Sequence, residues 1–220
     1  MAVNPQIKTL DLRPPKAPNL PIAPVDYGQR YQDQVLNALR LYFNEIDNFG
    51  AGIGSNTGGG FLQFPYGAFS SDQDQTATAN TATLMTFNTT DFANAVSINS
   101  SQITVDNAGI YNLQFSAQFQ NTDTAFQDVY IWLRQNGVDI PGSTGFISIP
   151  NRHAGTDGHA IVGWNYFVSM EAGDHIEIYW SVPNVAVTIQ HLNASGTPTK
   201  PSTQSVVATM SFVSRLPTNT

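Results

Sequence analysis

The feature that most limits how this chain can fold is a series of short segments, between residues 61 and 216, in which apolar and polar side chains alternate. A period of two is typical of half-buried strands, because successive side chains of a strand point to opposite faces of the sheet. Turn signals such as Asn136-Gly137 and Gly173-Asp174 separate the segments. This pattern predicts an all-β sandwich or barrel over residues 61–220. The clearest predicted strands are residues 110–120, 129–134, 160–170, 175–182 and 206–212.

A proline-rich segment, residues 1–25, precedes this region and holds six of the thirteen prolines. Each proline fixes φ and lacks a backbone donor, so we expect an extended, polyproline-like arm without a core of its own. Its apolar side chains predict that the arm anchors the protein on another surface. A disordered leader is the alternative. The anchoring residues are Ile7, Leu10, Leu12, Leu20, Ile22 and Val25.

Residues 26–49 form the one segment with helical periodicity. Asp26 can cap the helix, and apolar side chains then follow at spacings of three and four, which are typical of a short coiled-coil seam. So short a helix needs packing partners. Two arrangements are open: a stalk of three chains, or one helix packed against its own β domain. The predicted packing residues are Leu36, Leu39, Phe43 and Ile46.

Six glycines lie in residues 50–60. The segment resembles a phosphate-binding loop only superficially, because it lacks the lysine and follows a helix instead of a strand. We therefore expect a flexible Gly-rich linker between the helix and the β domain.

Charged residues make up only 11% of the chain, against roughly 25% in an average soluble domain. A surface solvated by amides and hydroxyls lacks strong charge repulsion and suits permanent assembly. The net charge of −7 argues against nucleic acid and anionic membranes as partners. The absence of cysteine excludes disulfides and cysteine-bound zinc. We also expect no signal peptide and no membrane span, because no suitable apolar run occurs.

The order of motifs in the β region resembles the globular heads of the first complement component and their tumour-necrosis-factor relatives. The resemblance covers about residues 65–216. It implies a jelly roll of about ten strands that assembles as a tight homotrimer. The matching segments are Phe69 with Phe87, Ile103–Leu113, Val129–Ile140, Trp164–Met170 with Gly173-Asp174, Ile176–Trp180 and Ser205–Val213. The collagen stalk of complement heads has no counterpart here, since no Gly-X-Y repeat occurs.

A second resemblance concerns the source. Several segments are similar to virion-associated proteins of marine and cyanobacterial phages, which implies a structural role on a phage particle. The segments are Asp26-Tyr27, Tyr31-Gln32, Leu39–Asn44, Phe64–Phe69, Asn80–Ala82, Met85–Asp91 and Val96–Ile98.

Candidate chemistry in the sequence is weak. His153, Asp157 and His159 could ligate a metal, but they lie in a glycine-containing loop with no fourth ligand, so we expect neither a metal nor any other cofactor. Asp72 and Asp74 could act as paired carboxylates, but a solvated loop is the better interpretation. We find no catalytic residues and predict a protein that is not an enzyme.

Aromatic side chains on alternate strand faces would leave apolar surface uncovered in a monomer. In a trimer they would line the three-fold axis. A sugar-stacking site is the alternative, which we disfavour because these residues lie on strands and not on apical loops. The predicted trimer-interface residues are Tyr130, Trp132, Tyr166, Phe167 and Tyr179.

These features predict a bacteriophage structural protein, made in the host bacterial cytoplasm and located in the virion. Its expected role is a trimeric capsid decoration, or cement, protein that docks through residues 1–49 on the major capsid protein or another virion protein. One alternative is a tail or fibre component that binds host-surface glycans through apical loops. A glycan-processing enzyme is the third possibility, and it would need a convergent acid pair.

Overall fold

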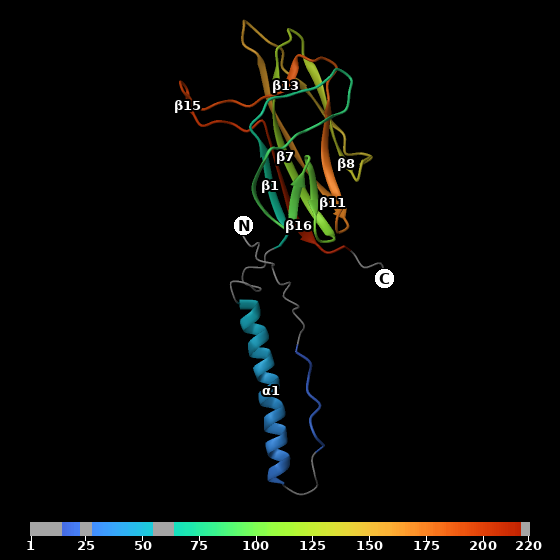
Figure 1. The fold of residues 1–220 in the computed structure, drawn as a ribbon, viewed down its shortest axis with the longest axis vertical. Helices are drawn as coiled ribbons and strands as arrows, with labels where there is room; N and C mark the ends of the chain where they lie inside the picture. Colours follow the sequence, from blue (N-terminus) through green and yellow to red (C-terminus); the bar gives the residue numbers. More distant parts are fainter. Residues whose placement is uncertain (1–14, 23–27, 55–63, 217–220) are drawn as a thin grey trace. The chain divides into compact units, whose positions relative to one another are not determined.

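The computed structural model describes residues 15–22, 28–54 and 64–216. The chain forms two compact units, Met1–Gln63 and Phe64–Thr220, and each is described by itself. The first contains an extended segment, residues 15–22, and one helix; the second is all β (Figure 1).

Helix α1 spans Gln29–Gly54, so both of its bounds differ from the predicted 26 and 49. It begins after Gly28, whose carbonyl accepts hydrogen bonds from the amides of Tyr31 and Gln32 at 3.0 and 3.2 Å. The expected cap, Asp26, and linker residues 55–60 lie outside the described residues. Residues 50–54, assigned to the linker from their glycines, continue the helix. A glycine costs only about 1 kcal/mol relative to alanine in a helix, which does not by itself end one.

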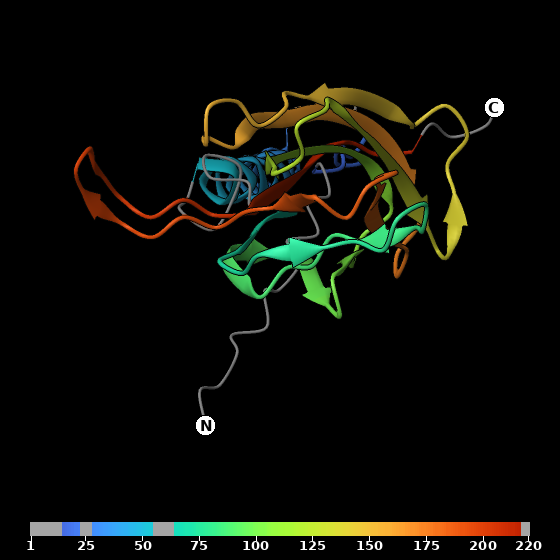
Figure 2. The same cartoon turned by 90° about the horizontal axis from the view of Figure 1, so that it is seen from above.

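The second unit is a sandwich of two antiparallel sheets with the jelly-roll architecture, so the predicted fold class is confirmed (Figures 1 and 2). Ten of its strands have four residues or more, and the five strands predicted from alternation correspond to β7, β8, β11, β12 and β16. Sheet A has the order β2-β13-β7-β16-β1-β4, with β11 also paired to β7. Its strands are β1 (Tyr66–Ser71), β2 (Gln75–Thr76), β4 (Thr89–Asn94), β7 (Gly109–Asn121), β11 (Gly158–Met170), β13 (Val187–Ile189) and β16 (Val206–Ser214).

Sheet B has the order β10-β8-β12-β6-β5, with β3 added to β12 and β9 added to β8. A separate two-stranded hairpin, β14–β15, stands between β13 and β16 in the sequence. The remaining strands are β3 (Thr83–Leu84), β5 (Val96–Asn99), β6 (Gln102–Val105), β8 (Gln127–Gln135), β9 (Val138–Asp139), β10 (Gly145–Ile149), β12 (His175–Ser181), β14 (Ser195–Gly196) and β15 (Thr199–Lys200).

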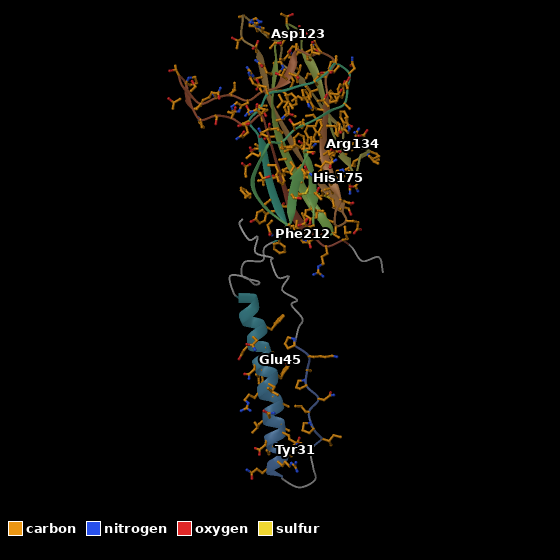
Figure 3. All side chains as sticks on the ribbon, in the orientation of Figure 1. Tyr31, Glu45, Asp123, Arg134, His175 and Phe212 are labelled. Atoms are coloured by element: carbon orange, nitrogen blue, oxygen red, sulfur yellow. The ribbon has the colours of Figure 1, made fainter. Side chains whose placement is uncertain are left out.

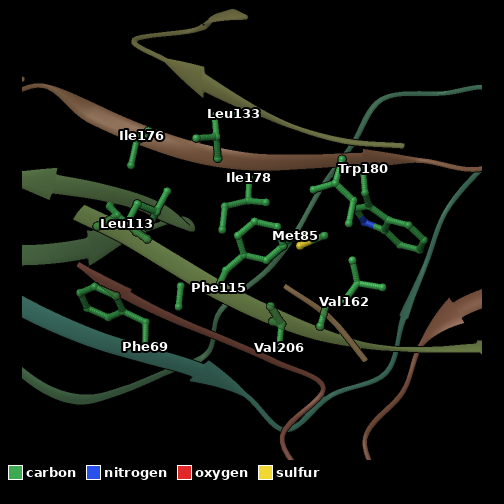
Figure 4. Packing of buried hydrophobic residues seen from close by; sticks show 14 of the residues in the cluster. Phe69, Met85, Leu113, Phe115, Leu133, Val162, Ile176, Ile178, Trp180 and Val206 are labelled. Carbon is green, nitrogen blue, oxygen red and sulfur yellow. The ribbon is translucent and has the colours of Figure 1, made fainter. Parts of the chain in front are cut away.

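The core lies between the two sheets (Figure 4). Every second residue of β7 is buried, from Tyr111 to Phe119, and faces the buried side chains of β8 and β12. Phe119 meets Trp180 edge to face across the core, with ring centroids 5.6 Å apart. Each fully buried side chain of this size contributes about 1.5–3 kcal/mol. Because every second side chain of β7 is held in the core, the side chains between them must point away from it, and they define the outer face of sheet A.

Among the described residues, no helix is both long and apolar enough to cross a membrane.

Candidate interaction surfaces

The three weak candidates for metal ligands do not form a metal site. Asp157 instead lies 3.3 Å from the guanidinium of Arg152 and accepts a hydrogen bond from Gln120 at 2.7 Å. His153 pairs with Thr156 in a tight backbone bridge, and His159 is exposed on β11. No group of three or more possible ligands comes together anywhere in the described part of the chain.

Asp72 and Asp74 each bind neighbouring amides. Asp72 accepts hydrogen bonds from the side chains of Gln73 and Asn88 at 2.8 and 2.6 Å, and these bonds lower the pKa of its carboxyl group. Asp74 accepts the backbone amide hydrogen of His191 at 2.6 Å. Both carboxylates therefore serve local loop structure, and the lowered pKa of Asp72 does not suit it to act as the acid in glycoside hydrolysis.

The apical loops are held together by one residue, Asp123. Asp123 lies at the opposite end of the sandwich from Phe212 (Figure 3). Its Oδ2 accepts hydrogen bonds from Gln127 and Asn184, both at 2.6 Å. Its backbone carbonyl accepts one from the amide of Arg152. These bonds join three loops into one apical structure.

The outer face of sheet A carries no charged side chain across its central strands. On β7 the outward residues alternate with the buried ones, and the register places Asn112 between Ser211 and Phe167. Most side chains of the following rows along these strands are amides, hydroxyls or small groups, with Val207 and Ile161 as apolar exceptions. The outward positions of β7, β11 and β16 include Ile110, Asn112, Gln114, Ser116, Gln118, Gln120, His159, Ile161, Gly163, Asn165, Phe167, Ser169, Val207, Thr209 and Ser211.

One edge of this face is open. Within the described residues, the 13-residue strand β11 has only β7 as a strand partner, so its other edge presents backbone groups without a paired strand. Two large apolar side chains stand out from it: Ile161 is 73% exposed and Phe167 is 62% exposed. Natural proteins protect long edges with charges, prolines or bulges. β11 has no charged residue and no proline, so this edge is suited to contact with another chain.

The outer face of sheet B carries a row of stacked side chains. Tyr130 stacks on Phe146 with centroids 5.9 Å apart, and Trp132 stacks on Tyr179 at the same distance. The guanidinium of Arg134 lies 4.0 Å from the centre of the Tyr179 ring. Cross-strand pairs of this kind each stabilise a sheet by about 0.2–1 kcal/mol. Phe146 nevertheless stays 70% exposed and Tyr130 41% exposed, so the row covers its own apolar surface only in part.

Asp139 fixes one end of this row. Its Oδ1 accepts hydrogen bonds from Arg134 Nε and Trp132 Nε1, both at 2.8 Å. The bond from Arg134, followed by that from Trp132, lowers the pKa of the Asp139 carboxyl group. Asp139 remains ionised at neutral pH and neutralises the charge of Arg134.

The structure does not bring the five predicted interface residues together. Tyr130, Trp132 and Tyr179 lie on the outer face of sheet B, whereas Phe167 lies on the outer face of sheet A. Tyr166 points inward, packs against the core and donates a hydrogen bond from its hydroxyl to the carbonyl of Ser143 at 2.8 Å. The reason is the period of two: Tyr166 and Phe167 are neighbours in sequence and so take opposite faces.

In the first unit, the apolar stripe of α1 is covered on one side only. Leu39 and Ile46 of the predicted seam are half-buried, whereas Leu36 and Phe43 are 61% and 58% exposed. The half-buried residues of the stripe are Tyr31, Val35, Ala38, Leu39, Tyr42, Ile46 and Phe49. The predicted packing of α1 on another helix or domain stays a prediction, and Leu36 and Phe43 form an exposed apolar edge that such a contact could cover.

Residues 15–22 lie beside α1 in the same unit (Figures 1 and 2). Pro15, Pro18 and Pro21 are half-buried, which matches the three-residue turn of a polyproline helix. Leu20 and Ile22 are 50% and 95% exposed, so they are free to contact another surface. The other predicted anchoring residues, Ile7, Leu10, Leu12 and Val25, lie outside the described residues.

Sequence reasoning missed two features of the second unit. The first is Ile161, which the alternation of residues 160–170 already placed on the same face as Phe167. The second is a shallow hollow of about 250 Å³ beside it, with Gln118 and Leu192 among its lining residues. No sequence signal could have found the hollow, because it joins segments far apart in the chain.

No protein-family model matches the chain, and no curated protein matches it in sequence. Among solved structures, the chain is similar to the globular domain of the zebrafish complement 1qA protein, with 13% identity and a TM-score of 0.41. The match covers 69% of this chain and 99% of that chain.

Proposed function

We propose that this protein is a non-enzymatic structural protein of a bacteriophage particle. In this proposal it is a homotrimeric capsid decoration protein, and its first unit attaches it to the major capsid protein or another virion protein. The phage assignment is supported by the sequence segments that are similar to virion-associated proteins. The trimer and the attachment are supported by the surfaces described above.

The observation that carries the proposal is the outer face of sheet A over β7, β11 and β16, with its open β11 edge. A second copy that covered this part of the face would bury Ile161 and Phe167, and the outward side chains of these three strands include no Asp, Glu, Lys or Arg. Burying charges is the main cost of joining two polar surfaces, and over these strands that cost is small. Amide and hydroxyl side chains such as Gln114 and Asn165 can exchange water for hydrogen bonds to a partner. The face is thus suited to permanent association.

Ring closure limits how the two outer faces can be used. Sheets A and B pack face to face, so their outer faces point in opposite directions. A contact between the outer face of sheet A in one copy and that of sheet B in the next would stack copies in an open row, so the trimer contact uses only one of them. We assign it to the face and edge of sheet A, because the 13-residue strand β11 has an unpaired edge within the described residues. Phe167 then lies in the contact, and Tyr130, Trp132 and Tyr179 lie outside it.

Attachment to the particle is assigned to the first unit. Leu20, Ile22, Leu36 and Phe43 are all at least half exposed there. Three copies of such a unit on one trimer would bind by avidity, so that weak individual contacts add up to a stable attachment.

The experiment is a comparison of two matched charge substitutions. Phe167→Lys should convert the trimer to monomers, because three ammonium groups would be buried at the contact. Val138→Lys changes a residue of similar exposure, 70%, on the β8–β9 hairpin of the other sheet, and should leave the trimer intact. Sedimentation velocity reads out both. A wild-type monomer, or a Phe167→Lys trimer, would refute the assignment.

A further inference from the structure

The hairpin β14–β15 has no evident role within its own domain. It forms a two-stranded sheet of its own, in which Ser195 pairs with Lys200 and Gly196 with Thr199. Figures 1 and 2 show it standing out from the sandwich. Thr197, Pro198 and Thr199 at its end are all exposed. The hairpin adds nothing to the core.

Such an element is costly to order by itself. Each residue fixed in one backbone conformation loses roughly 1–2 kcal/mol of conformational free energy, and an isolated two-stranded hairpin is only marginally stable in water. The hairpin has no aromatic residue to pack across its strands. It is tied at its base by the bridge between Leu192 and Thr203 and by local hydrogen bonds. Contact with a partner would supply the missing stabilisation.

The position of its base indicates which surface that partner occupies. Leu192, where the hairpin begins, lines the hollow together with Gln118 and Ile161. Gln118 and Ile161 are outward residues of sheet A. A molecule that docks on this part of the outer face of sheet A therefore comes against the base of the hairpin.

The charge of the hairpin indicates the chemistry of the partner. Residues 192–203 contain one basic side chain, Lys200, and no acidic one. Its ammonium group donates a hydrogen bond to the carbonyl of Asn193 at 2.7 Å, and no carboxylate of the described residues lies within ion-pair distance. The β unit as a whole has eleven Asp and Glu against four Lys and Arg. A second copy of this unit therefore presents the acidic surface that an unpaired lysine fits.

We infer that the β14–β15 hairpin is a clasp that lies against a second copy of the chain and places Lys200 next to that copy's acidic surface. The inference rests on the proposed self-association and adds a specific contact to it.

The test uses the absence of cysteine from the chain. Thr197→Cys introduces one thiol at the end of the hairpin, to which a benzophenone maleimide is attached before irradiation. We expect a covalent product of two chains, with the cross-linked peptide of the second chain identified by mass spectrometry. Val138→Cys, labelled in the same way on the other sheet, should give no two-chain product. Mixing chains of natural and heavy isotope content, with reassembly, distinguishes links between copies from links within one.

A second variant tests the charge. Lys200→Glu should raise the protein concentration at which the trimer dissociates by about two- to fivefold per contact, the range of an exposed ion pair. A wild-type trimer whose Thr197→Cys label forms links only within its own chain, or none, would overturn the clasp and leave the trimer proposal standing. A wild-type monomer would overturn both.

Discussion

Tyr111 is a residue whose polar group is inside the core, and its chemistry can be tested by pH. The side chain is fully buried, and its hydroxyl donates a hydrogen bond to the carbonyl of Asn107 at 2.7 Å. Burial, with a smaller effect from the charge of Asp106, raises the pKa of the phenol to about 12. The phenol is harder to ionise in the folded protein than in the unfolded chain, where its pKa is about 10.

This difference gives a stability prediction with a definite sign. Because the folded pKa is raised, the contribution of Tyr111 is fully present below pH 10 and is lost as the pH rises from 10 towards 12. Tyr111→Phe should cost about 1 kcal/mol at pH 7, the value of one buried hydrogen bond. It should also remove part of the alkaline loss of stability. Urea unfolding of both proteins at pH 7 and pH 11 measures the two effects. If the free energy of unfolding fell by the same amount between pH 7 and pH 11 in the wild type and in Tyr111→Phe, the raised pKa could not be assigned to Tyr111.

At the scale of elements, alternation in the sequence was sufficient to find the long strands, and it also assigned Tyr166 and Phe167 to opposite faces of β11. It could not tell which face is the inner one, because residues 160–170 are apolar on both sides. The answer depends on pairing with β7, whose buried residues are opposite Val162, Trp164 and Tyr166. Sheet assignment, the hollow and the projecting hairpin likewise depend on contacts between distant segments. The end of α1 was misjudged because glycine was taken as a stop.

The open edge of α1 gives the prediction at this scale. In a three-chain stalk, Leu36 and Phe43 would lie against neighbouring helices, so Phe43→Glu should raise the dissociation constant of the trimer at least about tenfold, or about 1.4 kcal/mol. Asn44→Glu adds the same charge at the next, exposed position and should have little effect. Analytical ultracentrifugation over a dilution series compares them. Equal dissociation constants for the Phe43→Glu and Asn44→Glu trimers would show that the exposed edge of α1 does not join helices of different chains.

At the scale of the whole molecule, the two units differ in charge. Residues 1–63 contain five acidic and five basic side chains, so the entire net charge of −7 belongs to the β unit. On the proposed particle, an acidic β unit would keep assembled particles apart in solution, because like charges repel over the screening length. A neutral first unit has no such repulsion from the surface on which it docks. In the proposed function, this difference in charge matches an attachment role for the first unit and a solvent-facing role for the β unit.

This division predicts what happens when the arm is removed. A protein without residues 1–24 keeps the sheet A face, so it should remain a soluble trimer by sedimentation. It loses Leu20 and Ile22, which the full chain exposes, and with three arms missing per trimer the avidity of attachment should collapse. If the protein is the phage component that we propose, both versions can be incubated with phage particles that lack it, and pelleting then compares the bound fractions. Equal binding would place the attachment elsewhere, whereas loss of the trimer itself would show that the arm belongs to the assembly contact.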